Sequence, residues 1–148
     1  MQLQDIYKTL SDNSCLALCY LYTILDDNAS PEEKNPDFLN ITLNALLLAA
    51  YTNQIGLNKE CYVTDADKLM NEAALSMQIS KRYKVEKIKV EAIPALPNGY
   101  VAVKFESGFN AHWVLYKDRT LLYNSLSNSK CFSYGKPTEG RVIHVQSQ

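Results

Sequence analysis

The sequence predicts a single α+β domain in which N-terminal helices pack on a C-terminal antiparallel sheet. Apolar residues recur at helical spacing through the first half of the chain, whereas they alternate with polar residues beyond residue 80. Neither a linker nor a repeat separates the halves, and 148 residues are enough to bury one sizeable core. We therefore expect one domain that spans residues 1–148 and keeps helices and strands in separate layers.

Three long helices are expected in the first half, and each has a start signal. Ser14 can cap the first, Asn35 followed by Pro36 begins the second, and Thr64 with Asp67 three residues later marks the third. The second helix is apolar on nearly all sides, which predicts that it is buried. The expected helices run from residue 15 to about 26, from 36 to about 50 and from 66 to about 77.

Five strands are expected in the second half, where turn residues separate short alternating segments. Pro97-Asn98-Gly99 and Lys117-Asp118-Arg119 supply turn chemistry at two of the boundaries. Strands that follow one another through short turns predict an antiparallel meander. The expected strands cover residues 83–90, 100–105, 111–116, 120–123 and 141–145.

Composition and charge argue against several classes of protein. The net charge is −1 and the cationic residues are scattered, so no field draws the chain to nucleic acid or to an anionic membrane. The N-terminus lacks the basic start and apolar segment of a signal peptide, and the longest apolar run, residues 45–51, is too short to span a bilayer. We expect a cytoplasmic protein without stable membrane insertion, and the oligomeric state stays open.

Four cysteines occur, at positions 15, 19, 61 and 131, and none belongs to a CxxC pair. A structural zinc site is therefore not expected, and no other metal or organic cofactor is implied. Cys19, Cys61 and Cys131 are interpreted as small apolar filler in the core, reduced in a cytosolic compartment. Cys15 differs from them because it stands where the first helix begins.

The position of Cys15 suits a nucleophile for two reasons. A helix N-terminus presents free backbone N–H groups and the positive end of the helix dipole, which lower a thiol pKa. The same N–H groups can stabilise an oxyanion that forms beside the sulfur. Cys15 is therefore the candidate nucleophile, and an inert core thiol is the alternative.

His112 and Asn124 are the candidate partners of Cys15. His112 opens one expected strand and Asn124 closes the next. With the turn centred near Asp118, the two residues lie opposite each other and point to the same face. His112 would act as the base and Asn124 would orient its ring, completing a Cys-His-Asn set. The alternatives are an ordinary strand histidine and a turn asparagine.

This order of elements resembles the papain-like cysteine peptidase superfamily. The matching segments are Ser11-Asp12-Asn13-Ser14-Cys15, Ala111-His112-Trp113-Val114 and Leu122-Tyr123-Asn124-Ser125. The layout is most similar to small bacterial and phage proteins related to the C39-like, bacteriocin-processing peptidases. The resemblance implies a papain-like fold and a thiol hydrolase that cleaves a peptide or isopeptide bond in a peptide or protein substrate.

Two positions depart from the pattern of that superfamily. Such peptidases place a Gln several residues before the cysteine as an oxyanion donor, but residues 9–11 here are Thr-Leu-Ser; many relatives also have Gly where this chain has Leu16. Asn13 is a substitute donor, or else a turn residue at the start of the helix. A catalytically inactive papain-like binding or regulatory module is therefore the alternative function, and a structural domain is the third.

Overall fold

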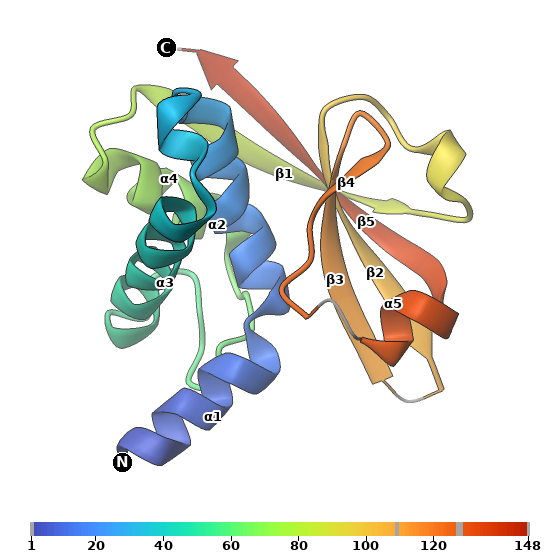
Figure 1. Ribbon diagram of the computed structural model, residues 1–148, viewed down its shortest axis with the longest axis horizontal. Coiled ribbons are helices and arrows are strands. Elements are labelled where there is room, and N and C mark those ends of the chain that lie inside the picture. Colours follow the sequence, from blue (N-terminus) through green and yellow to red (C-terminus); the bar gives the residue numbers. More distant parts are fainter. Residues whose placement is uncertain (1, 109, 127–128, 148) are drawn as a thin grey trace.

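The structure, a computed structural model, describes residues 2–108, 110–126 and 129–147. Three helices cover one face of a five-stranded antiparallel sheet and a short helix near the C-terminus packs on the other, which confirms the predicted α+β layout (Figure 1). The helices are α1 (Leu3–Asn13), α2 (Cys15–Asn28), α3 (Pro36–Thr52), α4 (Ala66–Ser76) and α5 (Lys130–Tyr134), with short 3₁₀ turns at Glu32–Lys34 and Ile93–Ala95. The strands are β1 (Lys81–Lys89), β2 (Tyr100–Ser107), β3 (Asn110–Lys117), β4 (Thr120–Tyr123) and β5 (Lys136–Ser147).

The strand order is β1-β5-β2-β3-β4. β2, β3 and β4 form the predicted run of hairpins, but the prediction of a simple meander is wrong for the last strand. β5 lies between β1 and β2 and pairs with both. β1 and β2 therefore run parallel on either side of β5, and residues 90–99 cross two strand spacings, about 10 Å, while they return along β5 from the level of Glu139 to that of Ile143.

Helix α2 forms the centre of the core between the sheet and the outer helices. Nine of its fourteen residues are buried, because α2 packs on β3 from one side while α3 and α4 cover it from the other. α4 in turn protects the free edge of β1 with side chains. Asn71 hydrogen-bonds both the N–H and the C=O of Tyr83, at 2.8 and 2.9 Å, and Asp67 accepts the N–H of Val85 at 2.9 Å.

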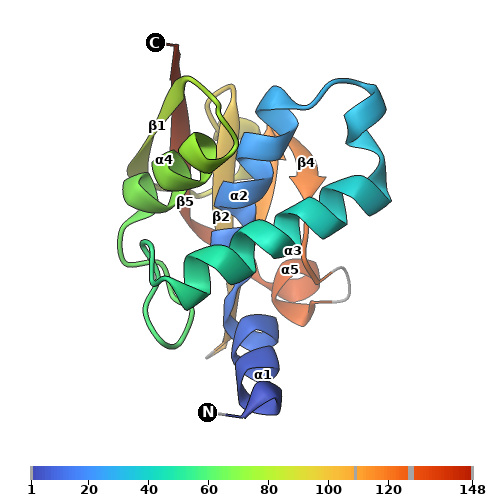
Figure 2. The same cartoon turned by 90° about the vertical axis from the view of Figure 1, so that its left-hand side faces the viewer.

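Helix α3 begins as predicted but is not buried all round. The side chain of Asn35 caps it by accepting from the N–H of Asp37 at 2.9 Å. Its inner face is buried, whereas Ile41 and Phe38 on the outer face are 72% and 47% exposed. The expectation of complete burial is wrong, because α3 is the outermost layer and only one side of it meets α2 (Figure 2).

Helix α1 is an element that the sequence analysis did not predict. It extends away from the body of the molecule and contains no buried residue (Figures 1 and 2). The polar stretch before Cys15 is therefore the last turn of α1, and the chain bends at Ser14 to enter α2. Within the described part of the chain, no helix has the length and apolarity required to cross a membrane.

Candidate active site

Cys15 is the first residue of α2, as predicted. The carbonyl of Ser14 accepts the first helical hydrogen bond, from Leu18 at 2.8 Å, and the Ser14 hydroxyl makes no cap. The first backbone N–H groups of α2 are therefore without helical partners at the place where the thiol emerges.

The sulfur of Cys15 lies near the backbone of Trp113, in the part of β3 that precedes its pairing with β4. Burial raises the pKa of the Cys15 thiol, and hydrogen bonds from the backbone N–H groups of Trp113, Leu16 and Cys15 itself lower it without reversing the shift. The predicted lowering of this pKa is wrong, because packing against the sheet removes water from a thiol that the helix N-terminus alone would activate.

His112 and Asn124 are joined directly. The Nε2 atom of His112 and the Oδ1 atom of Asn124 lie 2.7 Å apart, and His112 is only 6% exposed. The backbone N–H of Leu126 also donates to Asn124 Oδ1, at 3.1 Å. Because a backbone N–H can only donate, this contact supports the placement of the amide oxygen, and His112 Nε2 must then be the donor to it.

The register that produces this contact differs from the predicted one. The turn pairs Lys117 with Thr120, one residue away from the expected register, which alone would carry Asn124 to the opposite face from His112. A bulge between Leu115 and Tyr116 shifts the register once more and pairs Leu115 with Tyr123. Continuing that register would place Asn124 diagonally, not directly, across from His112 on the same face.

Trp113 lies between Cys15 and this pair, since its backbone N–H is near the Cys15 thiol and it directly follows His112 in sequence. Among the described residues, no hydrogen bond joins Cys15 to His112. His112 alternates with Trp113, whose ring packs on the helical side, so the imidazole starts from the other face of the sheet. A contact between the imidazole and the sulfur would therefore have to form around the edge of β3 where it is not paired with β4. That contact stays a prediction.

Helix α5 covers the face of the sheet from which His112 projects. It packs on β2 and β3, and Phe132 meets Phe105, the strand partner of His112, edge-on at 5.0 Å. This helix was not expected from the sequence, because five residues are too few for a helical period to show. The available signal was Ser129, whose hydroxyl caps the helix by accepting from Phe132 N–H at 3.4 Å.

Asn13 lies at the end of α1, and its side chain is turned toward the loop before Val63. Its amide donates to the carbonyl of Glu60 at 2.9 Å and accepts from the Tyr62 hydroxyl at 3.3 Å. These contacts tie the start of α2 to that loop. The role of Asn13 as an oxyanion donor stays a prediction.

The other three cysteines are buried, as expected of apolar filler. Burial raises the pKa of Cys61 to about 11 and raises that of Cys19 well above its usual value. Cys15 is half-buried, so it is the most exposed of the four cysteines. The described residues contain no group of three or more His, Cys, Asp or Glu side chains arranged to hold a metal ion.

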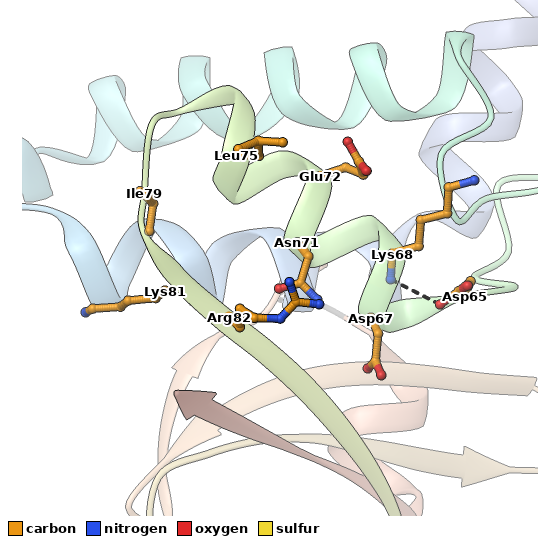
Figure 3. A pocket seen from close by; sticks show the side chains of 9 residues that line it. All are labelled: Asp65, Asp67, Lys68, Asn71, Glu72, Leu75, Ile79, Lys81 and Arg82. Carbon is orange, nitrogen blue, oxygen red and sulfur yellow. Dashed lines mark hydrogen bonds between the residues drawn. The ribbon is translucent and has the colours of Figure 1, made fainter. Parts of the chain in front are cut away.

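A hollow lies away from these residues, between α4 and β1 (Figure 3). Its volume is about 480 Å³, and its walls carry charges of both signs, among them Glu72, Lys81 and Arg82. None of its lining residues is a cysteine, histidine, serine or threonine. It therefore offers no thiol or hydroxyl nucleophile and no imidazole base, and the candidate thiol chemistry lies at Cys15 and His112.

Comparison with known proteins adds no relative to this geometry: no family model, curated protein or solved structure matches the chain. The candidate site accordingly rests on its own residues. Those residues are a half-buried thiol at a helix N-terminus, a strand histidine that directly precedes Trp113, and an asparagine hydrogen-bonded to that histidine.

Proposed function

We propose that this protein is a thiol hydrolase of papain-like type that cleaves a peptide or isopeptide bond. The observation that carries the proposal is the 2.7 Å hydrogen bond between His112 and Asn124 beside the strand residue that contacts Cys15. With its proton on Nε2, the neutral imidazole has Nδ1 as an acceptor, which is the state that a general base requires.

The reaction proceeds by two acyl transfers. His112 Nδ1 takes the proton of Cys15 as the sulfur attacks the carbonyl carbon, and the backbone N–H groups at the start of α2 stabilise the oxyanion. The imidazolium then protonates the leaving amine, the C–N bond breaks and a thioester remains. In the second stage His112 deprotonates a water that attacks the thioester, and the acid product leaves as the thiol is restored.

The alternative function is a catalytically inactive binding or regulatory module of the same architecture. Its support is the raised pKa of Cys15, together with the engagement of Asn13 by Glu60, which leaves the missing upstream Gln without an evident substitute. A site of this kind would bind a peptide segment without cleaving it. The two functions differ in one measurable step, the acylation of Cys15.

Acylation can be measured with p-nitrophenyl acetate, followed by peptide mapping of the product. The hydrolase predicts a burst of nitrophenol and acetylation at Cys15, both absent from Cys15→Ala. Cys131→Ala is the matched control and keeps both. Cys15→Ala should cost about 1 kcal/mol of stability or less, so its melting temperature shows that the fold survives.

The base is tested in the same assay with a matched pair of histidine variants. His112→Ala should slow acylation by about 100-fold or more, whereas His144→Ala should leave it unchanged, because His144 is exposed on β5 and pairs with Glu86. Acetylation that spreads over several cysteines, or that survives His112→Ala, would favour the inactive module.

A further inference from the structure

A second hollow opens beside the start of α2, on the helical face of the sheet. Its volume is about 300 Å³, and α2, the beginning of α4, β1 and β5 supply its walls. Leu16 and Tyr20 line it from α2, so it begins one residue beyond the candidate nucleophile. A substrate held at Cys15 would therefore have a neighbouring residue within reach of this hollow.

Arg141 connects the hollow to the strand of the candidate base. It lines the hollow from β5, and its guanidinium lies over the ring of Trp113, with 4.8 Å between the guanidinium carbon and the ring centroid. Trp113 follows His112, and its backbone N–H lies close enough to the Cys15 thiol to lower its pKa against the larger effect of burial. One residue thus contacts the candidate nucleophile with its backbone and Arg141 with its side chain.

The carboxylates in the hollow are occupied by backbone groups. Asp65 accepts the N–H of Lys68 at 3.0 Å and caps α4, and Asp67 accepts the N–H of Val85 at 2.9 Å. Their positions are therefore set by the local fold.

The two cationic side chains of the hollow, Lys87 and Arg141, are less engaged than its carboxylates. In the part of the chain that the structure describes, neither Arg141 nor Lys87 forms an ion pair with a carboxylate. Arg141 donates a hydrogen bond to the carbonyl of Gly140 at 3.1 Å, and it also interacts with the hydroxyl of Tyr20, whose pKa it lowers against the larger effect of burial. A guanidinium has five N–H donors, so most of its capacity remains for a ligand.

We propose that this hollow binds a carboxylate of the substrate, with Arg141 as the anion-binding group. The inference rests on the proposed hydrolase and names its substrate class: peptides with an acidic side chain, or a free C-terminal carboxylate, close to the bond that Cys15 attacks. A planar guanidinium matches a carboxylate through two parallel hydrogen bonds, and the Trp113 ring beneath it restricts its orientation.

Trp113 supplies the readout, because it is the only tryptophan in the chain and Arg141 lies over its ring. Fluorescence titrations would use Cys15→Ala protein and three acetylated pentapeptides with alanines around the central residue. The first has a central Glu and an amidated C-terminus, the second has Gln in place of Glu, and the third is the Gln peptide with a free C-terminal carboxylate.

The proposal predicts saturable binding of the Glu peptide, of the free-carboxylate peptide, or of both. This binding should be at least about tenfold tighter than that of the amidated Gln peptide, a difference of about 1.4 kcal/mol in binding free energy. The peptide that binds tells which carboxylate is recognised. Equal binding of all three peptides, or binding of none, overturns the proposal.

Variants locate the interaction. Arg141→Gln should remove the preference for the carboxylate, Arg141→Lys should retain part of it, and Arg82→Gln is the matched control in the neighbouring hollow. A preference that survives Arg141→Gln in folded protein would contradict the proposal. Because binding is measured without Cys15, failure here leaves the acylation test untouched, and failed acylation leaves this binding test valid.

Discussion

Asn124 shows how one side chain can define the chemistry of another. Its oxygen accepts from two donors, the backbone N–H of Leu126 and Nε2 of His112. The first contact orients the amide, and the second then holds the proton of the neutral imidazole on Nε2. The loop after β4 thereby selects the tautomer in which Nδ1 can accept a proton from a thiol.

Cys15 depends on that acceptor more than a helix N-terminus alone would suggest. Burial raises the pKa of its thiol above the ordinary value, so the isolated group is protonated at neutral pH. Ionisation at neutral pH therefore requires a base, which is His112 in the proposed mechanism. Activation by a base, and not by the helix dipole, is the physical content of the proposed site.

Alkylation with iodoacetamide should label Cys15 before the other cysteines of the folded protein. Cys15 is half-buried, whereas Cys19, Cys61 and Cys131 are buried, and the raised pKa values of Cys19 and Cys61 further reduce their thiolate fraction. Peptide mapping after brief labelling measures the order. Labelling of any of the other three ahead of Cys15 would contradict the assignment.

At the scale of elements, α2 aligns the site because it is held at both ends along β3. Its first residue contacts Trp113, and Asp26 near its end accepts from the Tyr100 hydroxyl at 2.7 Å and from Lys117 at 3.2 Å. Residues 15–26 of a helix span about 16 Å. Residues 113–117 of a strand span about 14 Å, so the two anchors nearly match in length.

The middle of α2 also positions Asn124. Tyr22 stacks on Tyr123, the last residue of β4, with ring centroids 4.4 Å apart and an interplanar angle of 19°. Asn124 follows at once, so the stack fixes the backbone from which its amide projects. The helix that carries the candidate nucleophile therefore also supports the residue that is hydrogen-bonded to His112.

Asp26→Asn should lower the stability of the fold by about 1–2 kcal/mol at pH 7, because it removes a charged acceptor. Burial alone would raise the pKa of Asp26, but Tyr100, Lys117 and Lys34 more than offset it and lower the pKa. A folded-state pKa below the unfolded value gives stability that is present above about pH 4 and is lost as the pH falls through the folded pKa.

Urea titrations at several pH values measure this difference. The gap between wild type and Asp26→Asn should be complete at neutral pH and should shrink below about pH 4. Asp12→Asn is the control, since Asp12 makes an exposed pair with Lys8 on α1 and its loss should cost under about 0.5 kcal/mol. A gap that stays constant to low pH would contradict the role given to the Asp26 charge.

The two faces of α3 predict opposite effects of similar substitutions. Leu43 is 1% exposed and faces α2, so Leu43→Ala should cost about 2–5 kcal/mol. Ile41, two residues earlier, lies on the outer face, and Ile41→Ala should change stability by about 0.5 kcal/mol or less. Denaturant midpoints of the two variants test this, and equal losses would mean that both faces of α3 are covered.

At the scale of the whole molecule, the elements with long apolar periods were predictable from sequence. The alternating segments gave four strands near their observed bounds, and the Asn35 cap marked the start of α3 to the residue. Cys15 was placed correctly at the first position of α2 because the start of a buried helix has a strong pattern. These features depend on neighbours in sequence.

Features that depend on partners far away in sequence were not predictable. The place of β5 between β1 and β2 follows from pairing across 30 or more residues. The bulge that returns Asn124 to the face of His112 leaves no mark in residues 115–123, and the burial that raises the pKa of Cys15 comes from packing on the sheet. Local patterns therefore gave the site residues but not their environment.

The central claim, that Cys15, His112 and Asn124 act as one unit, is tested most directly by a double-variant cycle on the rate of Cys15 alkylation at pH 7. His112→Ala and Asn124→Ala should each slow the reaction, His112→Ala by about tenfold or more, because the thiolate loses its partner. In the double variant, loss of Asn124 should add nothing, since Asn124 acts only through His112. The account would be contradicted if the effects of the two substitutions were additive, or if the rate were unchanged in folded His112→Ala protein.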